Sequence, residues 1–403
     1  MKAIIKSVPI LCALFSPVIF ACEKPASVCF QDNEGLPLIS DGQPLPIIIS
    51  PSADSAVKRV AKAFSQDIQR VGGTPAGISQ SQSISQPAVI IGVLGEDILI
   101  DELVQKGKLD VSQIKGQWEA YQIAVVEEPS PGVEHALVVV GADRRGAIFG
   151  TFDISEQMGV SPWYWFADVP TELKSNVFIT AGSTQDKPKV RYRGIFINDE
   201  DPALKGWAQK KFGGVNAGMY EHVFDLILRL KGNYIWPAMW GKAFHLDDPQ
   251  NTALADNMGM VMGTSHHEPM TRAHAEWHRK SENPAGGGAW NYETNRESIK
   301  EFWRGGIERM MSKGNGKPYE SLVTVGMRGD GDEPMSEGTA IELLEKVVDD
   351  QRAIIADVTG KPAEQTPQVW ALYKEVQDYY DKGMTVPDDV TLLFADDNWG
   401  LVR

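Results

Sequence analysis

Short apolar runs that end in polar or aromatic side chains recur through the second half of the chain. The first run covers residues 194–197, and five later runs follow the same pattern. The side chains at the six ends are Asn198, Asp199 and Glu200; Trp236 and Trp240; His266 and His267; Arg328 and Asp332; Glu375; and Asp396, Asp397 and Trp399. Helix-length segments separate the runs, which is typical of a (β/α) barrel whose strand ends meet at one active face.

The first half of the chain predicts a smaller α/β domain. Apolar positions 57, 60, 64, 68 and 71 form the stripe of an amphipathic helix that ends at Gly72 and Gly73. The strand-like segments around this helix are residues 46–49, 88–93, 121–127 and 135–142. Arg144 and Arg145 follow the last of these segments and read as surface charges. We therefore predict an N-terminal α/β domain over residues 22–185.

Residues 186–403 predict a catalytic barrel of the TIM type. A complete (β/α)8 barrel has eight strands, and only about six are predicted here. A barrel that lacks two strands has open edges and an uncovered core. We therefore expect the barrel to be incomplete in this chain, and the chain to be part of a longer protein.

The first 21 residues predict a secretory signal peptide, because Lys2 and Lys6 precede an apolar run that is short for a membrane span. We expect an exported protein, periplasmic or extracellular. A lipoprotein tether at Cys22 is an alternative, since the preceding residues faintly resemble a lipoprotein box. Without lipid, Cys22 and Cys29 could form a disulfide in an oxidising compartment or stay as two free thiols.

Composition narrows the classes of partner. The 403-residue chain carries a formal net charge of −15 and has no basic run, which argues against nucleic acid. After the N-terminal segment no apolar run approaches the roughly 20 residues that a membrane span requires. We predict neither a nucleic-acid partner nor a membrane span.

Carboxyl groups are the main candidates for chemistry. Glu375, Asp332, Asp199 and Asp396 lie at four different predicted strand ends. Carboxyl groups gathered at a barrel mouth would raise one another's pKa values, and glycoside hydrolysis uses one carboxyl as acid and another for water or the anomeric carbon. The alternative is that single acids at strand ends cap the following helices.

Aromatic and cationic side chains at the same ends suit a sugar. Trp236, Trp240 and Trp399 could lie against the apolar face of a ring, although tryptophan is often a core residue. Three successive aromatics end at Trp165, and at least one should lie at a ligand surface or at the interface between the domains. Arg328, with the His266–His267 pair, would favour an acidic sugar.

The sequence offers weak support for a metal. His274 and His278 lie one helical turn apart, but the segment HAEWH has its Glu at the third position, where the metalloprotease helix needs it second. Residues 330–333 begin like a calcium loop and lack its continuation. We predict no catalytic metal.

Long motifs resemble those of glycoside hydrolase family 115, the xylan α-1,2-glucuronidases. They are RGIFINDEDPAL (193–204), KFGGVNAGMYEHVFDLILRLKGNYIWPAMW (211–240), GTSHHEPM (263–270), MRGDGDEPM (327–335), LYKEVQDYYDKG (372–383) and LLFADDNWG (392–400). Residues 141–170 are similar to the α/β domain that precedes the barrel in this family. The resemblance covers nearly the whole chain after the predicted signal.

The resemblance implies removal of α-1,2-linked glucuronic acid, or its 4-O-methyl form, from glucuronoxylan or its oligosaccharides, with inversion and no organic cofactor. Glu375 is expected to be the general acid, and Asp332, Asp199 and Asp396 are the candidates for activating water. The residues expected to bind the sugar are Asn198, Glu200, Trp236, Trp240, His266, His267, Arg328, Asp397, Trp399 and Trp165. Among them, Arg328 and the two histidines would hold the sugar carboxylate.

Two alternatives stay open. One is an exo-glycosidase for a neutral or amino sugar on the same scaffold, and the other is a non-catalytic glycan-binding protein. Members of the family continue through the rest of the barrel, a helical region and a β-domain, and often form dimers through these later parts. A homodimer is therefore expected of the full-length protein.

Overall fold

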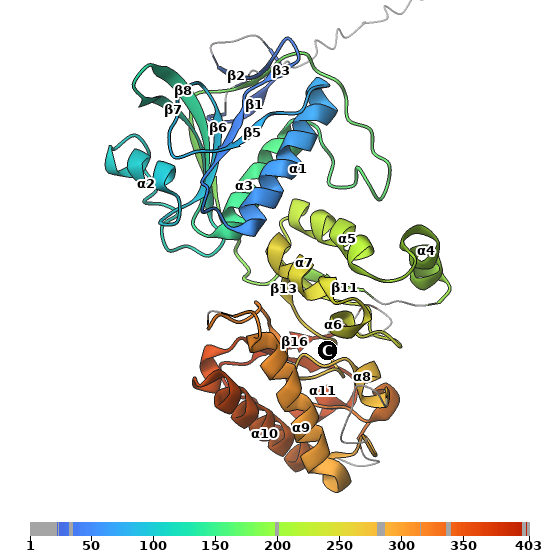
Figure 1. Cartoon of the computed structure of the whole chain (residues 1–403). Coiled ribbons are helices and arrows are strands. Elements are labelled where there is room, and N and C mark those ends of the chain that lie inside the picture. Colours follow the sequence, from blue (N-terminus) through green and yellow to red (C-terminus); the bar gives the residue numbers. More distant parts are fainter. Residues whose placement is uncertain are drawn as a thin grey trace, which may run out of the picture.

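The computed structural model shows a mixed α/β architecture (Figure 1). It describes residues 22, 24–31, 35–197, 201–279, 287–314, 316–335, 340–396 and 400. The predicted signal peptide lies outside these residues. Within the described part of the chain, no helix has both the length and the hydropathy needed to cross a membrane.

A six-stranded sheet forms the N-terminal part, in the order β10-β7-β8-β6-β4-β5. The neighbouring pairs β5/β4, β4/β6 and β6/β8 are parallel, and β8/β7 and β7/β10 are antiparallel. The strands are β4 (Ile47–Ile49), β5 (Ile78–Gln80), β6 (Val89–Val93), β7 (Tyr121–Ser130), β8 (Val133–Gly141) and β10 (Gly182–Asp186).

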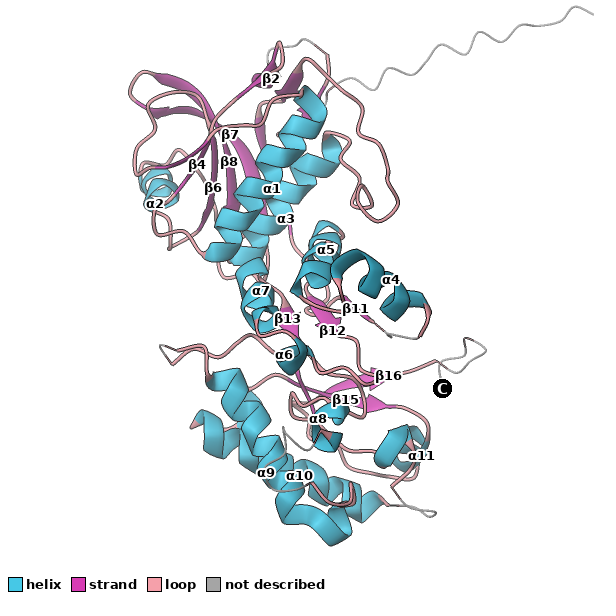
Figure 2. Cartoon of the chain, turned by 45° about the vertical axis from the view of Figure 1, so that its right-hand side comes forward, coloured by secondary structure: helices cyan, strands magenta, loops and turns pink. Residues whose placement is uncertain are grey.

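Helices cover both faces of this sheet, because its strands are apolar on both sides. Helices α1 (Ser55–Gly72) and α3 (Arg144–Gln157) lie over one face of the sheet (Figure 2), and Ile47 and Ile49 of β4 belong to the core on that face. Ile48 faces the opposite core, which α2 (Ile98–Gln105) covers. This alternation follows from the two-residue period of a strand. The predicted α/β composition of the N-terminal half is confirmed.

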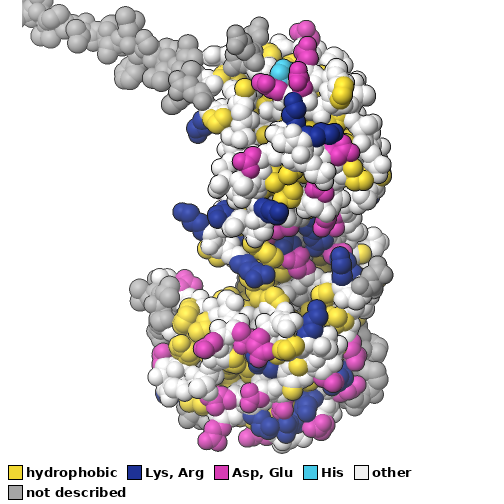
Figure 3. Space-filling view, turned by 90° about the vertical axis from the view of Figure 1, so that its left-hand side faces the viewer, with side chains coloured by type: hydrophobic (Ala, Val, Ile, Leu, Met, Phe, Trp, Pro, Cys, Tyr) yellow, Lys and Arg dark blue, Asp and Glu magenta, His cyan; other side chains and the backbone are white. Residues whose placement is uncertain are grey.

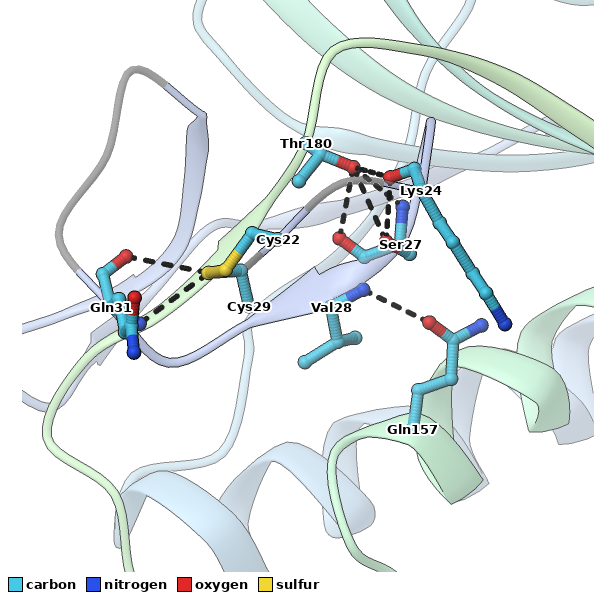
Figure 4. Close-up of a disulfide and its surroundings, with 8 residues drawn as sticks. All are labelled: Cys22, Lys24, Ser27, Val28, Cys29, Gln31, Gln157 and Thr180. Carbon is cyan, nitrogen blue, oxygen red and sulfur yellow. Dashed lines mark hydrogen bonds between the residues drawn. A yellow bond between two sulfur atoms is a disulfide. The ribbon is translucent and has the colours of Figure 1, made fainter. Parts of the chain in front are cut away.

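A four-stranded sheet, ordered β1-β9-β2-β3, lies beside the first. Its strands are β1 (Val28–Cys29), β2 (Leu36–Ser40), β3 (Gln43–Pro44) and β9 (Val177–Ile179). A disulfide joins Cys22 to Cys29, whose Cα atoms are 5.6 Å apart (Figure 4). Beside it, the backbone N–H of Val28 donates to the Gln157 side chain of α3 at 2.9 Å. The two cysteines therefore pair, which was one of the two expected outcomes.

Six parallel strands follow one another in chain order through the second half. They are β11 (Gly194–Phe196), β12 (Tyr234–Trp236), β13 (Val261–Met262), β14 (Val323–Thr324), β15 (Gln368–Leu372) and β16 (Thr391–Phe394). They form two three-stranded sheets, and a parallel bridge between Met262 and Ser321 connects the sheets. Pairing among the described residues does not close these strands into a barrel.

Helices alternate with these strands, as the apolar periodicity predicts. They are α4 (Ala203–Phe212), α5 (Ala217–Arg229), α6 (Phe244–Asp247), α7 (Gln250–Met258), α8 (His274–His278), α9 (Tyr292–Met311), α10 (Ile341–Thr359) and α11 (Glu375–Asp381). Two short 3₁₀ turns are η1 (Asp330–Asp332) and η2 (Ala363–Gln365). Acidic and basic side chains are interspersed over the face shown in Figure 3.

The hydrophobic core does not divide where the sheets do. One core cluster runs from Ala26 to Met262 and so includes both the helices α1 and α3 and the strand β12. A second cluster runs from Met270 to Val390 beneath α9 and α10. Strands β12 and β13 therefore share their packing with the N-terminal sheet.

A buried ion network also links the two halves. Arg145 is 3% exposed, so the expectation of a surface charge is wrong for this residue. Its guanidinium pairs with Glu119 and with Glu320, and Glu119 also accepts from Arg193 at 2.7 Å and from Asn233 at 2.7 Å. Burial of Glu119 requires this full set of donors, because an unpaired buried charge is costly.

A second buried pair joins α1 to α5. Arg229 Nη1 lies 2.8 Å from Asp67 Oδ2, and both side chains are almost fully buried. Arg59 and Glu221 join the same two helices, but both side chains are substantially exposed. The two pairs differ mainly in burial, which makes them a natural comparison.

We expect Arg229→Met to lower the free energy of unfolding by about 3 kcal/mol, because the buried Asp67 carboxylate loses its buried partner and keeps the partly exposed Arg70. Urea denaturation measures this loss. The matched control is Arg59→Met, which should cost less than about 1 kcal/mol because its ion pair is exposed to solvent. Equal costs for the two variants would contradict the assignment of α1–α5 docking to the buried pair.

Candidate active site

Side chains from the ends of four successive parallel strands come together beside α8 and α11. Strand β15 is followed by Tyr373, and α11 then begins at Glu375. Arg328 comes four residues after β14, and His266 comes four residues after β13. Trp236 is the last residue of β12. The convergence arises because parallel strands in one run present their carboxyl ends at the same edge.

Arg328 is the centre of this cluster, and it is only 2% exposed. Its Nε atom donates to Glu375 Oε1 at 2.9 Å and its Nη2 atom to Glu375 Oε2 at 2.7 Å. Its Nη1 atom donates to both the backbone carbonyl and the carboxylate of Asp332. The guanidinium therefore holds two of the four carboxylates that we expected to be catalytic.

These contacts indicate a further role for Arg328 beside the expected one, which stays a prediction. We expected its fork to bind the carboxylate of a sugar, but three of its nitrogen atoms already donate to Glu375 and Asp332. Burial opposes the charge of Arg328, and the two carboxylates outweigh burial and raise its pKa. The contacts support a role in positioning Glu375 and Asp332.

The two predicted histidines also surround Asp332. His266 Nε2 lies 2.9 Å from Asp332 Oδ1, and His267 Nδ1 lies 3.8 Å from the same oxygen. Burial opposes ionisation of Asp332, but the hydrogen bond and charge of His266 and the charge of Arg328 outweigh it and lower the pKa of Asp332 to about 2. Burial, together with the charge of His266, lowers the pKa of His267 to about 3. Asp332 is therefore ionised at neutral pH, and His267 is neutral.

Aromatic rings line this group of charges. The His266 ring lies 4.8 Å from the ring of Tyr373 and 6.5 Å from that of Trp236, measured between centroids. The His267 ring lies 5.5 Å from the ring of Trp240. Trp240 and His267 also line a cavity of about 400 Å³. The predicted association of tryptophans with the histidine pair is present in the structure.

Two residues of the site have a left-handed backbone. The φ angle is +66° at Asp332 and +50° at Lys374, which lies between Tyr373 and Glu375. Residues other than glycine rarely adopt positive φ, and such strain is concentrated at functional sites. The strained turns direct Asp332 and Glu375 back toward Arg328.

Glu268 is a buried acid that we did not include among the predicted site residues. Its Oε1 atom accepts from the backbone N–H of His274 at 2.8 Å, and its Oε2 atom lies 3.3 Å from Ser265 Oγ. Burial raises the pKa of Glu268 to about 8, although both hydrogen bonds lower it. Glu268 directly follows His266 and His267, and Tyr373 directly follows β15, so the strand-end pattern could have identified both.

The remaining predicted site residues either do not join the cluster around Arg328 or lie outside the described part of the chain. Trp165 stacks on His222 with ring centroids 3.8 Å apart, beneath Lys211 and next to Phe212. It therefore belongs to the packing of α4 and α5, away from the contacts of Arg328. Asp396 is exposed after β16, and among the described residues no ion pair links it to the cluster. The predicted site residues outside the described part of the chain are Asn198, Asp199, Glu200, Asp397 and Trp399.

Comparison with known proteins now identifies the class. The model of glycosyl hydrolase family 115 matches residues 185–403. The chain therefore belongs to glycosyl hydrolase family 115, and the predicted resemblance is confirmed. No match is found among the curated proteins.

Solved structures refine this placement. BtGH115A, described as a family GH115 4-O-methyl-α-glucuronidase with specificity for decorated arabinogalactans, is 35% identical with a TM-score of 0.78. The match covers 91% of this chain and 47% of that protein, so the chain spans about half its length. CpGH84D is 13% identical with a TM-score of 0.53, covering 94% of this chain and 56% of that one, and shows similarity of fold alone.

The depressed pKa of Asp332 predicts a pH-dependent contribution to stability. Because the folded pKa lies below the unfolded value, the contribution is present above about pH 4 and is lost as the pH falls toward 2. At about pH 6 we expect Asp332→Asn to lower the free energy of unfolding by about 2 kcal/mol. Urea denaturation of both proteins should show this difference shrinking below about pH 4. A difference independent of pH would contradict the depressed pKa.

The raised pKa of Glu268 predicts the opposite dependence. The folded protein keeps a proton on Glu268 up to about pH 8, whereas the unfolded chain releases it near pH 4.5. Between these values the wild type should lose roughly 1.4 kcal/mol of stability per pH unit relative to Glu268→Gln. Thermal unfolding from pH 5 to about pH 9 tests this expectation. Parallel melting curves for the two proteins over that range would refute it.

Proposed function

We propose that this chain carries the main part of a glycosidase active site that releases α-1,2-linked glucuronic acid, or its 4-O-methyl form, from xylan or xylo-oligosaccharides. Membership of family 115 supports the reaction class. The observation that carries the proposal is Arg328, which holds Glu375 and Asp332 at adjacent strand ends. Carbohydrate hydrolysis needs such a pair of carboxyl groups in fixed positions.

The environment of Asp332 suits one half of the reaction. Its depressed pKa keeps it ionised, so it can accept a proton from water or stabilise positive charge at the anomeric carbon. Water forms the new bond to that carbon as the bond to the leaving sugar breaks. In an inverting enzyme this water attacks from the face opposite the leaving oxygen.

Glu375 is the proposed general acid, which protonates the leaving oxygen. Its two oxygens both accept hydrogen bonds from Arg328, which fixes the orientation of the carboxyl group. The alternative assignment gives the acid role to another carboxyl of the site and makes Glu375 the base.

The scaffold is proposed to be a TIM-type barrel that is incomplete in this chain. The inner strands β12, β13, β14 and β15 are buried throughout. The outer strands are exposed, with Ile195 and Phe196 on β11 and Phe394 on β16 all at least 40% exposed. Apolar outer strands of this kind require further cover, which two additional strands would provide. The domain division near residue 185 and dimerisation of the full-length protein remain predictions.

We propose that the protein is exported, on the basis of the predicted signal peptide and of the disulfide. Cys22 and Cys29 pair immediately after the predicted signal. Disulfides persist in oxidising compartments and are rare in reducing ones.

A second polysaccharide is supported by a specific observation. BtGH115A is described as specific for decorated arabinogalactans, and it is 35% identical to this chain. Its sugar is a 4-O-methyl-glucuronic acid, which is the sugar proposed here. Xylan and arabinogalactan are therefore the two candidates for the polysaccharide that carries the sugar, and the sugar released is the same in both cases.

The test is release of 4-O-methylglucuronic acid from glucuronoxylan oligosaccharides and from arabinogalactan. It should use the longest natural protein that contains this chain, with the product anomer followed by proton NMR. We expect the β-anomer, which indicates inversion. Release from neither glycan would reject the proposal in favour of a neutral sugar or of glycan binding without turnover.

We expect Glu375→Gln to lower the turnover number by about 10²- to 10⁴-fold, the range that positioned acid–base groups contribute. The matched control is Asp378→Asn, an exposed acid on the same helix α11, which should keep wild-type turnover. If the wild type and Glu375→Gln both bind the oligosaccharide and neither turns it over, the glycan-binding alternative would be supported.

A further inference from the structure

Three potential metal ligands converge beside the candidate active site. His274 Nε2 and His278 Nε2 lie 2.8 Å and 3.0 Å from Asp330 Oδ1. The two histidine nitrogens lie 3.0 Å from each other. The three atoms therefore form a nearly equilateral triangle, with two corners from α8 and one from η1.

This triangle is slightly smaller than one face of a tetrahedral metal site. Zn²⁺ binds imidazole nitrogen and carboxylate oxygen at about 2.0–2.2 Å, so tetrahedral ligands lie about 3.3–3.5 Å apart. A small outward movement of each side chain makes room for an ion just above the plane of the three atoms. Two histidines four residues apart on a helix also project from the same face, as metal-binding helices require.

The chemistry of the three groups favours a cation at this point. Among the described residues, the ion pairs of Asp330 are with His274 and His278 alone. His274 Nδ1 is buried without a hydrogen-bond partner, so this ring contacts a protein acceptor through Nε2, the nitrogen that faces Asp330.

A similar triad nearby is a weaker candidate. His266 and His267 also approach one carboxylate, that of Asp332. Asp332 is already paired with the guanidinium of Arg328, so its charge is compensated without a metal. His267 Nδ1 is also 3.8 Å from the carboxylate, farther than either histidine from Asp330. Among the described residues, no such cation compensates the charge of Asp330 in the triad on α8 and η1.

We propose that His274, His278 and Asp330 bind one divalent transition-metal cation, with Zn²⁺ the best match to two imidazoles and one carboxylate. The side chains of His278 and Asp330 are about half exposed, which leaves further coordination positions for water or a ligand. These positions face the cavity that Trp240 and His267 also line. The site is distinct from the carboxylates of the proposed hydrolysis.

The ion would have a structural consequence for the active site. Asp330 begins the 3₁₀ turn η1, and Asp332 ends it in a left-handed conformation. A metal that joins Asp330 to α8 would fix this turn, and with it the position of Asp332 against Arg328. Such bracing is the role of a positioning site, since the ion contacts neither carboxylate of the proposed reaction.

The test measures metal binding directly and needs no glycan. The longest natural protein that contains this chain, without a tag, is freed of metal by chelation and titrated with Zn²⁺ by calorimetry, and with Co²⁺ by visible absorption. We expect one ion per chain and the intense d–d bands of a four- or five-coordinate Co²⁺ site. We also expect Zn²⁺ to raise the melting temperature, because it binds the folded chain.

Variants locate the site. His278→Gln combined with Asp330→Asn should weaken Zn²⁺ binding by more than about 100-fold. This loss of affinity is larger than that expected from removing a residue that only orients a metal ligand. His135→Gln, which changes a histidine on β8 far along the chain, is the matched control and should bind as the wild type does. Because His278 is half exposed, its single variant His278→Gln serves if the double variant does not fold.

Three results would overturn the proposal. The first is the absence of stoichiometric Zn²⁺ or Co²⁺ binding by the folded wild type. The second is unchanged affinity in the double variant, which would indicate adventitious surface binding. The third is loss of binding in His266→Gln but not in His278→Gln, which would place the ion on the other triad. Since none of these readouts involves turnover, the failure of this proposal can be told apart from failure of the proposed glycosidase activity.

Discussion

The contact between buried Arg328 and two carboxylates is the interaction on which the site depends. A guanidinium that is 2% exposed is tolerable only when its charge is compensated, and Glu375 and Asp332 provide that compensation. The same contact joins the end of β14 to the start of α11 after β15. Stability and chemistry are therefore linked here, because the groups that neutralise the buried cation are also the groups proposed to act on the sugar.

The N-terminal sheet is part of the support for this site. Its core continues through α5 into β12, and the Arg145 network connects α3 to Glu320 immediately before β14. A buried charge network of this kind is costly to break and imposes one relative arrangement of its partners. The N-terminal core and the Arg145 network therefore help to position the first parallel strands. The chain itself passes from the N-terminal part to these strands only once, near residue 190.

The strand-end pattern anticipated much of the site, since Glu375, Asp332, His266, His267, Trp236 and Trp240 meet around Arg328. It did not anticipate how their charges pair. Arg328 was expected to bind substrate because arginine so often binds carboxylates, but the nearest carboxylates belong to the protein. Trp165 shows the same limitation, because a row of aromatic residues does not reveal that one of them stacks on His222 of α5.

What the sequence determined by itself is local and periodic. Alternation along strands, apolar stripes on helices and polar residues at strand ends predicted the α/β class and the run of six parallel strands, because these features follow from backbone geometry and solvent exclusion. The family was predicted separately, from the resemblance of long motifs. Only the tertiary structure decided which charges pair, that Arg145 is buried, that Glu268 keeps its proton and that His274, His278 and Asp330 converge. These outcomes depend on distances between residues far apart in the chain and on burial, which no local pattern records.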